Sequence, residues 1–225
     1  PHFTRTRTIT IADTVPAQPP ALRLATSQAI TLNGQQVVNH NSLIAEIDTG
    51  AGLQNCASFT SLRLTIEAGP ASATPTVLPT SPSAITLNCV DAPTQVTTLN
   101  LASRSDGEQT LRLWAIDSTG APSVVASSTS FVLDRTAPSS PTPLSLVNPV
   151  SSPGNMRTPT IRVGGVVSGD TVSLYSDPSC STPSLRASGV ATSNSIDLTT
   201  DSIAVDGTLI FYARSVDPAA NASNC

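Results

Sequence analysis

Few residues in this chain of 225 could carry out chemistry, and they lie far apart. The sharpest candidate is the turn sequence Asp48-Thr49-Gly50. A carboxylate in such a turn acts as a general acid or base when a second one lies about 3 Å away and shares its proton. Asp117 is followed by Ser-Thr-Gly, which is the wrong spacing for that partner. We therefore interpret residues 48–50 as a turn that ends a strand.

Nucleophilic and cofactor chemistry has equally little support. His2 and His40 are the only histidines, and His40 lies between two asparagines in a polar stretch without a G-x-S-x-G sequence. All 11 basic residues are arginines, which excludes Schiff-base and P-loop lysines. Histidines and cysteines are too dispersed for a zinc site. We expect no enzyme activity and no cofactor.

The acidic residues could instead bind a metal ion. Asp13, Asp117, Asp134 and Asp217 lie near the junctions expected between domains. Calcium needs six to eight oxygen ligands, whereas the 15 acidic residues are scattered singly. We expect these aspartates in solvated turns, with a calcium site as the alternative.

The four cysteines, Cys56, Cys89, Cys180 and Cys225, form two pairs that are local in sequence. An even count at polar, turn-like positions in a chain of low charge indicates an oxidising compartment. We predict disulfides Cys56–Cys89 and Cys180–Cys225, each within one domain. Four reduced thiols are the alternative.

Charge and hydropathy exclude two classes of partner. The net charge of −4 provides no basic surface for nucleic acid, and no apolar run reaches the 18–20 residues needed to insert in a membrane. If Leu111, Leu113 and Ala115 face a core, Trp114 faces outward and could contact a protein or a glycan. The alternative places Trp114 under the proline-rich insertion at residues 71–83 or against a second domain.

The elements that would position these residues are strands. Apolar and polar residues alternate along residues 61–66, 110–115, 172–175 and 209–214, and Gly, Pro, Asn and Asp bound the runs. This period of two is typical of half-buried strands, and no stretch of ten residues carries a helical apolar stripe. The sequence predicts an all-β fold.

Internal similarity divides the chain. Residues 14–24 and 136–146 share the pattern T-x-P-x-x-P-x-x-L-x-L, and alternating runs of equal length follow Asp-Gly at 106 and at 206. We predict one domain at 14–135 with a proline-rich insertion and another at 136–225. Residues 1–13, by position before the first T-x-P, are interpreted as a strand and linker from a preceding unit.

Two segments carry a family resemblance. Residues 130–138 (SFVLDRTAP) resemble a strand–linker junction, and residues 206–221 (DGTLIFYARSVDPAAN) resemble the penultimate strand, of bacterial immunoglobulin-like repeats. The resemblance departs from the family at Ala220, where a glycine is usual. It implies tandem immunoglobulin-like β-sandwich domains of a surface or adhesion protein.

We therefore expect a secreted or surface-displayed, non-enzymatic module of a bacterial adhesin or stalk that presents loops to a surface protein or glycan. The alternative is a filament subunit that binds neighbouring copies of itself by strand exchange. That alternative comes from residues 3–11, which read as a closing strand, and from the apparent lack of a closing strand after Asn221. A window cut from a longer repeat protein is the simpler explanation of both features. A carbohydrate-binding accessory domain would need a row of aromatics that the chain lacks.

Overall fold

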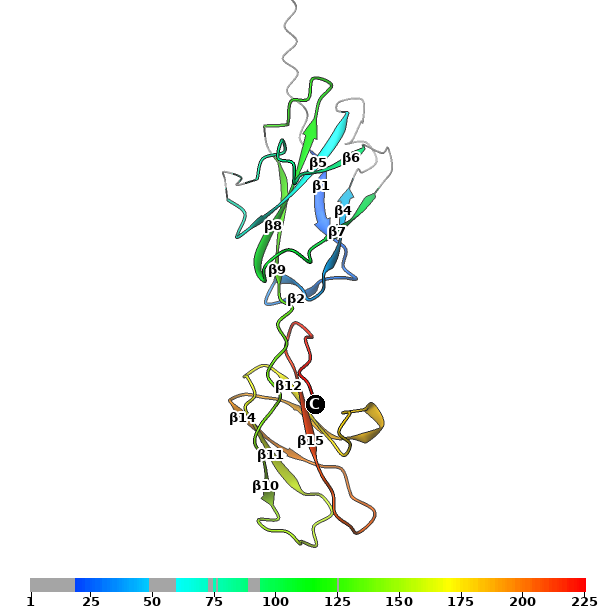
Figure 1. Cartoon of the computed structure of the whole chain (residues 1–225), viewed down its shortest axis with the longest axis vertical. Coiled ribbons are helices and arrows are strands. Elements are labelled where there is room, and N and C mark those ends of the chain that lie inside the picture. The colour runs from blue at the N-terminus through cyan, green and yellow to red at the C-terminus, as the bar shows by residue number, and fades with distance from the viewer. Residues whose placement is uncertain (1–18, 49–59, 73–74, 76, 89–93, 125) are drawn as a thin grey trace, which may run out of the picture. The chain divides into compact units, whose positions relative to one another are not determined.

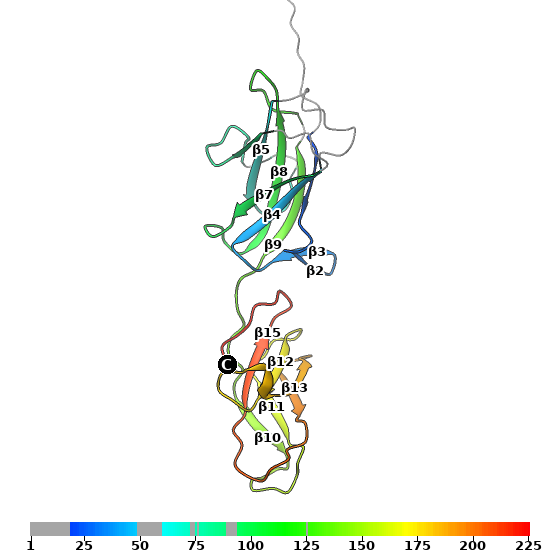
Figure 2. The same ribbon diagram turned by 90° about the vertical axis from the view of Figure 1, so that its right-hand side faces the viewer.

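The computed structural model describes residues 19–48, 60–72, 75, 77–88, 94–124 and 126–225. The described part contains strands β1 to β15 and one 3₁₀ turn, η2 (Thr182–Ser184), as Figures 1 and 2 show. The all-β prediction is confirmed. By their internal contacts the residues form two compact units, one of Pro1–Gln28, Ser42–Asn100 and Gly107–Phe131, the other of Ala29–Asn41, Leu101–Asp106 and Val132–Cys225. The domain boundary at 135/136 stays a prediction.

Two sheets of the chain before residue 134 form what we call the first sandwich. One sheet has the order β1-β4-β7, and the other has the order β2-β3-β9-β8-β5-β6. The strands are β1 (Ala21–Leu24), β2 (Ile30–Leu32), β3 (Gln35–Val38), β4 (Ser42–Asp48), β5 (Ser61–Ala68), β6 (Ile85–Asn88), β7 (Gln95–Asn100), β8 (Gly107–Ile116) and β9 (Ser127–Leu133).

Alternating strands supply the core of the first sandwich. In β4 every second side chain, Leu43, Ala45 and Ile47, is fully buried. In the other sheet β5 and β8 pair antiparallel with Leu64 opposite Leu113, and both side chains are buried. Burial of such side chains supplies most of the stabilisation of a sandwich, at about 25 cal/mol per Å² of apolar surface.

The second sandwich consists of two three-stranded sheets, β10-β11-β14 and β13-β12-β15. The strands are β10 (Leu144–Asn148), β11 (Thr160–Gly164), β12 (Thr171–Tyr175), β13 (Leu185–Val190), β14 (Ser195–Thr199) and β15 (Tyr212–Val216). The first, second and fifth strands form one sheet and the third, fourth and sixth the other, which is the immunoglobulin-like arrangement. The core between them includes Ile161, Val163, Val172 and Leu174.

The ends of β8 and β15 repeat one another closely. An isolated bridge joins Ile116 to Pro122 after β8, and the same bridge joins Val216 to Ala222 after β15. After each strand a serine one residue beyond the bridge also donates its backbone N–H back to the strand, to the carbonyl of residue 115 and of residue 215. The internal repeat read from the sequence is therefore a repeat of structure at these two turns.

Candidate binding groove

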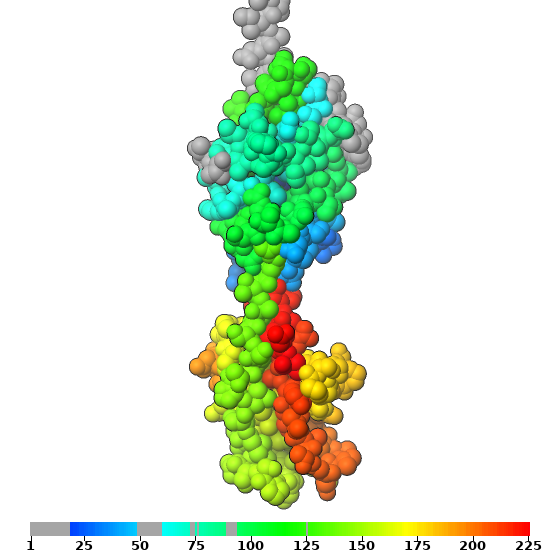
Figure 3. Space-filling model, viewed as in Figure 1, coloured from blue at the N-terminus to red at the C-terminus, as the bar shows by residue number. Residues whose placement is uncertain are grey.

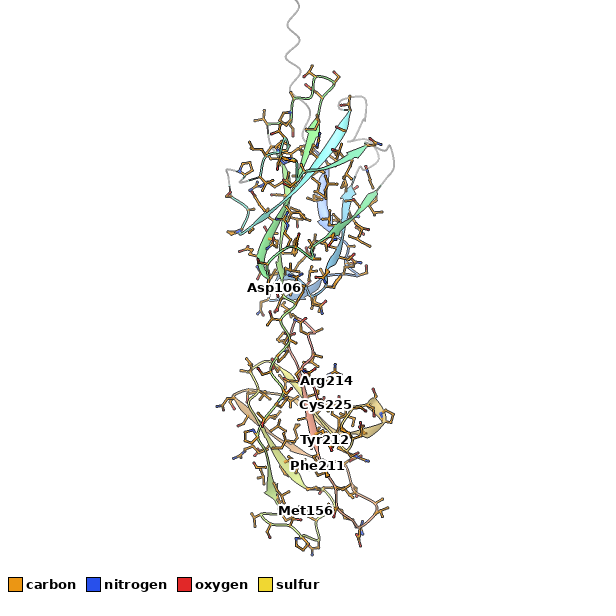
Figure 4. The ribbon with its side chains drawn as sticks, in the orientation of Figure 1. Asp106, Met156, Phe211, Tyr212, Arg214 and Cys225 are labelled. Carbon is orange, nitrogen blue, oxygen red and sulfur yellow. A yellow bond between two sulfur atoms is a disulfide. The ribbon has the colours of Figure 1, made fainter. Side chains whose placement is uncertain are left out.

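A groove opens at one end of the second sandwich, between β10 and the chain that leads into β15. It has a volume of about 280 Å³ and continues into an adjoining hollow of about 520 Å³. Figure 3 shows β10 and residues 207–216 side by side on this face, and in Figure 4 Met156 and Phe211 mark the groove. Its apolar lining is Leu146, Pro149, Met156, Pro159, Ile161, Ile203, Leu209 and Phe211.

The groove exists because residues 207–211 lack strand neighbours among the described residues. The ladder between β12 and β15 ends at the pair Tyr175–Tyr212. Leu209 is consequently 43% exposed and Ile210 62% exposed. Unpaired backbone and exposed aliphatic side chains together make this segment suited to bind another chain.

One arginine lies at the rim. Arg157 donates to the carbonyl oxygens of Ile203 and Ala204 at 2.8 and 3.0 Å, and its Nη2 lies 3.3 Å from an Asp206 oxygen. The Asp206 side chain is 95% exposed, so this ion pair contributes little. The groove is thus an apolar site with a mixed-charge rim, a chemistry for binding rather than for catalysis.

Asp106 of the first repeat corresponds in sequence to Asp206, but its carboxylate accepts several hydrogen bonds. Asp106 accepts hydrogen bonds from the backbone N and Nε of Arg135, both at 2.8 Å, and from the Thr136 hydroxyl at 3.0 Å. Partial burial acts to raise the pKa of Asp106, but these hydrogen bonds outweigh it and hold the pKa below its usual value. Asp106 therefore fixes the chain directly after β9.

A disulfide joins Cys180, in the loop after β12, to Cys225. Cys180 is buried, and the carboxylate of Asp177 organises its loop by accepting from Ser179 and Ser181. The bridge closes the second sandwich beside β15 (Figure 4). Cys56 and Cys89, the other predicted pair, lie outside the described residues.

Trp114 requires a correction, because its side chain is only 7% exposed. The sheet face opposite the core is itself covered, since Gly69 accepts from the Thr110 hydroxyl and Ser72 accepts from Arg112. Arg112 also forms a buried ion pair with Glu67 on this face. Alternation did turn Trp114 away from the core, and on the outer face its indole Nε1 lies 3.5 Å from the hydroxyl of Thr65 on β5. This burial agrees with the alternative of a covered Trp114 and does not support an outward ligand contact.

The aspartates considered for calcium are engaged in turns where the structure describes them. Asp117 accepts from the Thr119 hydroxyl, the main reason that its pKa is lowered, and also from two backbone N–H groups. Asp217 accepts from the backbone and the amide of Asn221, and the same amide donates to the carbonyl of Asp134 at 3.0 Å. Asp13 lies outside the described residues, and within them no three His, Cys, Asp or Glu side chains gather as a metal site would require.

The remaining chemical candidates are not brought together. Asp48 lies at the end of β4, 3.4 Å from an Arg23 nitrogen, and Thr49 and Gly50 lie outside the described residues. His40 is half-buried with Nδ1 3.1 Å from the Asn39 amide oxygen. His2 is also outside the described part. No helix among the described residues is long and apolar enough to cross a membrane.

Sequence reasoning missed the groove, although a signal for it was present. Five large aliphatic or aromatic residues fall within the nine positions 203–211: Ile203, Val205, Leu209, Ile210 and Phe211. Alternation assigns only part of them to a core. A count of the core-facing positions that the neighbouring strands can cover would have shown that some of these apolar side chains must stay exposed.

Comparison with known proteins gives likenesses of fold only. No family model and no curated protein matches the sequence. Among solved structures, the human OSCAR ligand-binding domain is 14% identical with a TM-score of 0.34, over 92% of this chain and 98% of that one. The chicken CNTN1 FN1–FN3 domains are 10% identical with a TM-score of 0.40, over 92% and 64%. A 1.5-MDa bacterial ice-binding adhesin is 14% identical with a TM-score of 0.38, over 92% and 63%. The chain thus spans somewhat under two thirds of the latter two.

Proposed function

We propose that this chain is a non-enzymatic module of a secreted or surface-displayed bacterial protein, and that it presents binding loops for adhesion. The partner is a protein on a cell or host surface. The loops concerned are residues 149–159 and 200–211, which line the groove of the second sandwich.

The observation that carries the proposal is the exposure of aliphatic side chains on these loops. Val150 is 90% exposed, Val205 78% and Ile210 62%. Exposed apolar residues on the two loops that line one groove indicate an interaction surface rather than the scattered exposure that is normal for a soluble protein. Because Trp114 is covered, no tryptophan offers a sugar-stacking platform, which favours a protein partner over a glycan.

The disulfide supports the extracellular part of the proposal. Disulfides persist in oxidising compartments and are rare in the cytosol. The bridge Cys180–Cys225 closes loops around a core with few large side chains. A covalent link of this kind suits a module that is exposed to an uncontrolled environment.

The test is adhesion of beads coated with the chain to surfaces that carry cells, extracellular matrix proteins or glycan arrays. The double variant Val150→Ser/Val205→Ser should lose at least tenfold in retained beads. Val124→Ser is the matched control, because Val124 is 77% exposed on the first sandwich, and it should bind as the parent does. Equal loss in both variants, or retention by the double variant, would contradict the proposal.

A second candidate function is that of a filament subunit assembled by strand exchange. The specific observation in its favour is the unpaired segment at residues 207–211 and the groove beside it. An exposed, unpaired segment beside an apolar groove is able to accept a strand from another chain.

A further inference from the structure

We propose that Arg135 is a mechanical anchor that resists tension reaching the first sandwich through residue 136. The inference rests on the proposed function, because a module that joins two surfaces is under tension whenever those surfaces move apart. It follows from the place of Arg135 in the chain and from the segments that its side chain holds together.

Arg135 lies at the point where the chain leaves the first sandwich. β9 ends at Leu133, and the next strand, β10, begins at Leu144. A pull on residue 136 therefore acts first on the end of β9. A strand that is loaded at a loose end separates one hydrogen bond at a time, whereas a strand whose end is held must break many bonds together. The attachment of this end thus determines how β9 responds to force.

On the side of β3, the backbone attaches the end of β9 by only a few hydrogen bonds. β9 pairs in parallel with β3 at two positions, Val37 with Val132 and Val38 with Leu133. One more backbone bond follows, from the N–H of Asp134 to the carbonyl of Val38 at 2.9 Å. Beyond this bond the attachment depends on side chains.

The Arg135 side chain supplies that attachment with all three guanidinium nitrogens. Nε donates to Asp106 at 2.8 Å, and the backbone N–H of Arg135 donates to the same carboxylate at 2.8 Å. Nη1 donates to the Asn41 side-chain oxygen and to the carbonyl of Leu101, and Nη2 donates to the carbonyl of Arg104. One residue thus ties the end of β9 to the loop before β4 and to the loop before β8.

The two loops that accept these bonds are themselves fixed. The N–H of Leu101 donates to the carbonyl of Asn41 at 2.7 Å, and the N–H of Arg104 donates to the carbonyl of Leu101 at 2.9 Å. The Leu101 side chain is fully buried. A pull on Arg135 is therefore passed to the core of the first sandwich rather than to a loose loop.

The ion pair of Arg135 differs from a pair within a sheet. The side chains of Arg135 and Asp106 are 22% and 30% exposed, whereas those of Arg162 and Asp197 are 54% and 40% exposed. Arg162 and Asp197 join β11 and β14, which are already paired along their length. Hydrogen bonds between ionised groups are stronger than neutral ones and gain further where water is partly excluded. Arg135 adds such bonds where the ladder between β3 and β9 has ended.

The experiment pulls single molecules of the full chain at constant force and measures the lifetime of the first sandwich. One handle is at the N-terminus, and the other is on an azide-bearing residue that replaces Ser140, which is exposed. Forced unfolding is governed by the unfolding rate. Arg135→Met removes the side-chain hydrogen bonds and should shorten the lifetime at least about tenfold. A lifetime equal to that of the parent overturns the inference.

The same variant pulled from another point is the matched control. With the second handle in place of Ser118, an exposed residue in the turn after β8, tension does not pass through residue 135. Arg135→Met should then shorten the lifetime far less than it does with the handle at position 140. Equal shortening from both handle positions would mean that Arg135 stabilises the fold without bearing load, which also overturns the inference.

A second variant keeps the test valid if Arg135→Met does not fold. Arg135→Lys keeps the charge but lacks the planar fork of donors that reaches several acceptors at once. With the handle at position 140 its lifetime should lie below that of the parent, and a lifetime equal to the parent's overturns the inference. Fluorescence of Trp114 like that of the parent shows that a variant is folded.

The bead assay separates this outcome from that of adhesion. Arg135→Met retains Val150 and Val205, and without applied force it should adhere as the parent does. Adhesion combined with a lifetime that does not depend on Arg135 overturns the anchor and leaves the adhesion proposal standing. A lifetime that depends on Arg135 in a chain that does not adhere overturns the adhesion proposal and leaves the anchor as a property of the first sandwich.

Discussion

Residues 107–116 and residues 207–216 begin with glycine and end at the same turn, but only the first run is a strand over its whole length. Gln109 is 2% exposed and Leu209, at the matching position, is 43% exposed. The more apolar residue is therefore the more exposed one. Neighbouring strands, rather than the side chain itself, determine burial at these positions.

The two sandwiches also differ in how many large side chains their cores bury. Among the described residues, the largest fully buried side chains lie at or before Leu133 with one exception, Leu174 of the second sandwich. The first sandwich closes with Phe131 and Leu133 of β9, and the second has the disulfide Cys180–Cys225 beside β15. We infer that packing dominates the stability of the first core and that a covalent link compensates for lean packing in the second.

The largest expected effect is at the strand that closes the first core. Phe131→Ala removes a fully buried aromatic ring and should lower the free energy of unfolding by about 3–5 kcal/mol. Leu209→Ala, at the open position of the second sandwich, should cost less than about 1 kcal/mol. Denaturant titration measures both, with the fluorescence of Trp114, the sole tryptophan, reporting on the first sandwich. Similar losses of unfolding free energy in the two variants would contradict the difference between the two sandwiches.

Loss of the disulfide should come next and affect the second sandwich alone. The bridge spans 45 residues, and opening it by Cys180→Ser/Cys225→Ser should cost about 2–4 kcal/mol. Trp114 fluorescence should keep its transition midpoint, whereas far-ultraviolet circular dichroism should show an earlier transition for part of the signal. A shift of the Trp114 midpoint by the same amount would show that the two sandwiches unfold together.

Much of this architecture could be predicted from sequence, for physical reasons that also explain the failures. Alternation in residues 61–66 identifies a strand because its side chains meet one core and one outer face. Alternation cannot say whether the outer face is covered, and the sequence therefore left both an outward-facing and a covered Trp114 open. The groove was missed because it depends on which strands are neighbours, a property of the topology and not of residues 203–211 themselves.

Substitution of Asp106, the aspartate of the first Asp-Gly pair, should have a smaller effect on the free energy of unfolding, and this effect should depend on pH. Because the folded-state pKa of Asp106 is depressed, its contribution is complete above the unfolded pKa, near 4, and is lost as the pH falls through the lower folded value. Asp106→Asn should cost about 1–2 kcal/mol at pH 7. The difference between parent and variant should shrink between pH 4 and pH 2.

Asp206→Asn is the matched control for this prediction. Its carboxylate is 95% exposed and has a single contact at 3.3 Å, so the variant should unfold with the parent within about 0.3 kcal/mol at every pH. Thermal unfolding at pH 7, 4 and 3 measures both. A cost for Asp106→Asn that does not change with pH would mean that the stabilisation does not depend on the ionised form of Asp106.

The smallest effect concerns the two matching turns. Gly120 has a φ of +87° and Ala220 a φ of +67°, so both are in the left-handed region, where a Cβ is unfavourable. Ala220→Gly should stabilise the second sandwich by about 0.5–1 kcal/mol, since relief of the left-handed alanine exceeds the entropy that glycine loses. Gly120→Ala should destabilise the first sandwich by a similar amount, because a Cβ there meets no atom within 4 Å and only the backbone preference changes. Opposite signs in differential denaturation would show that the two turns are equivalent, and equal signs would show that the sandwiches differ there as they do at the groove.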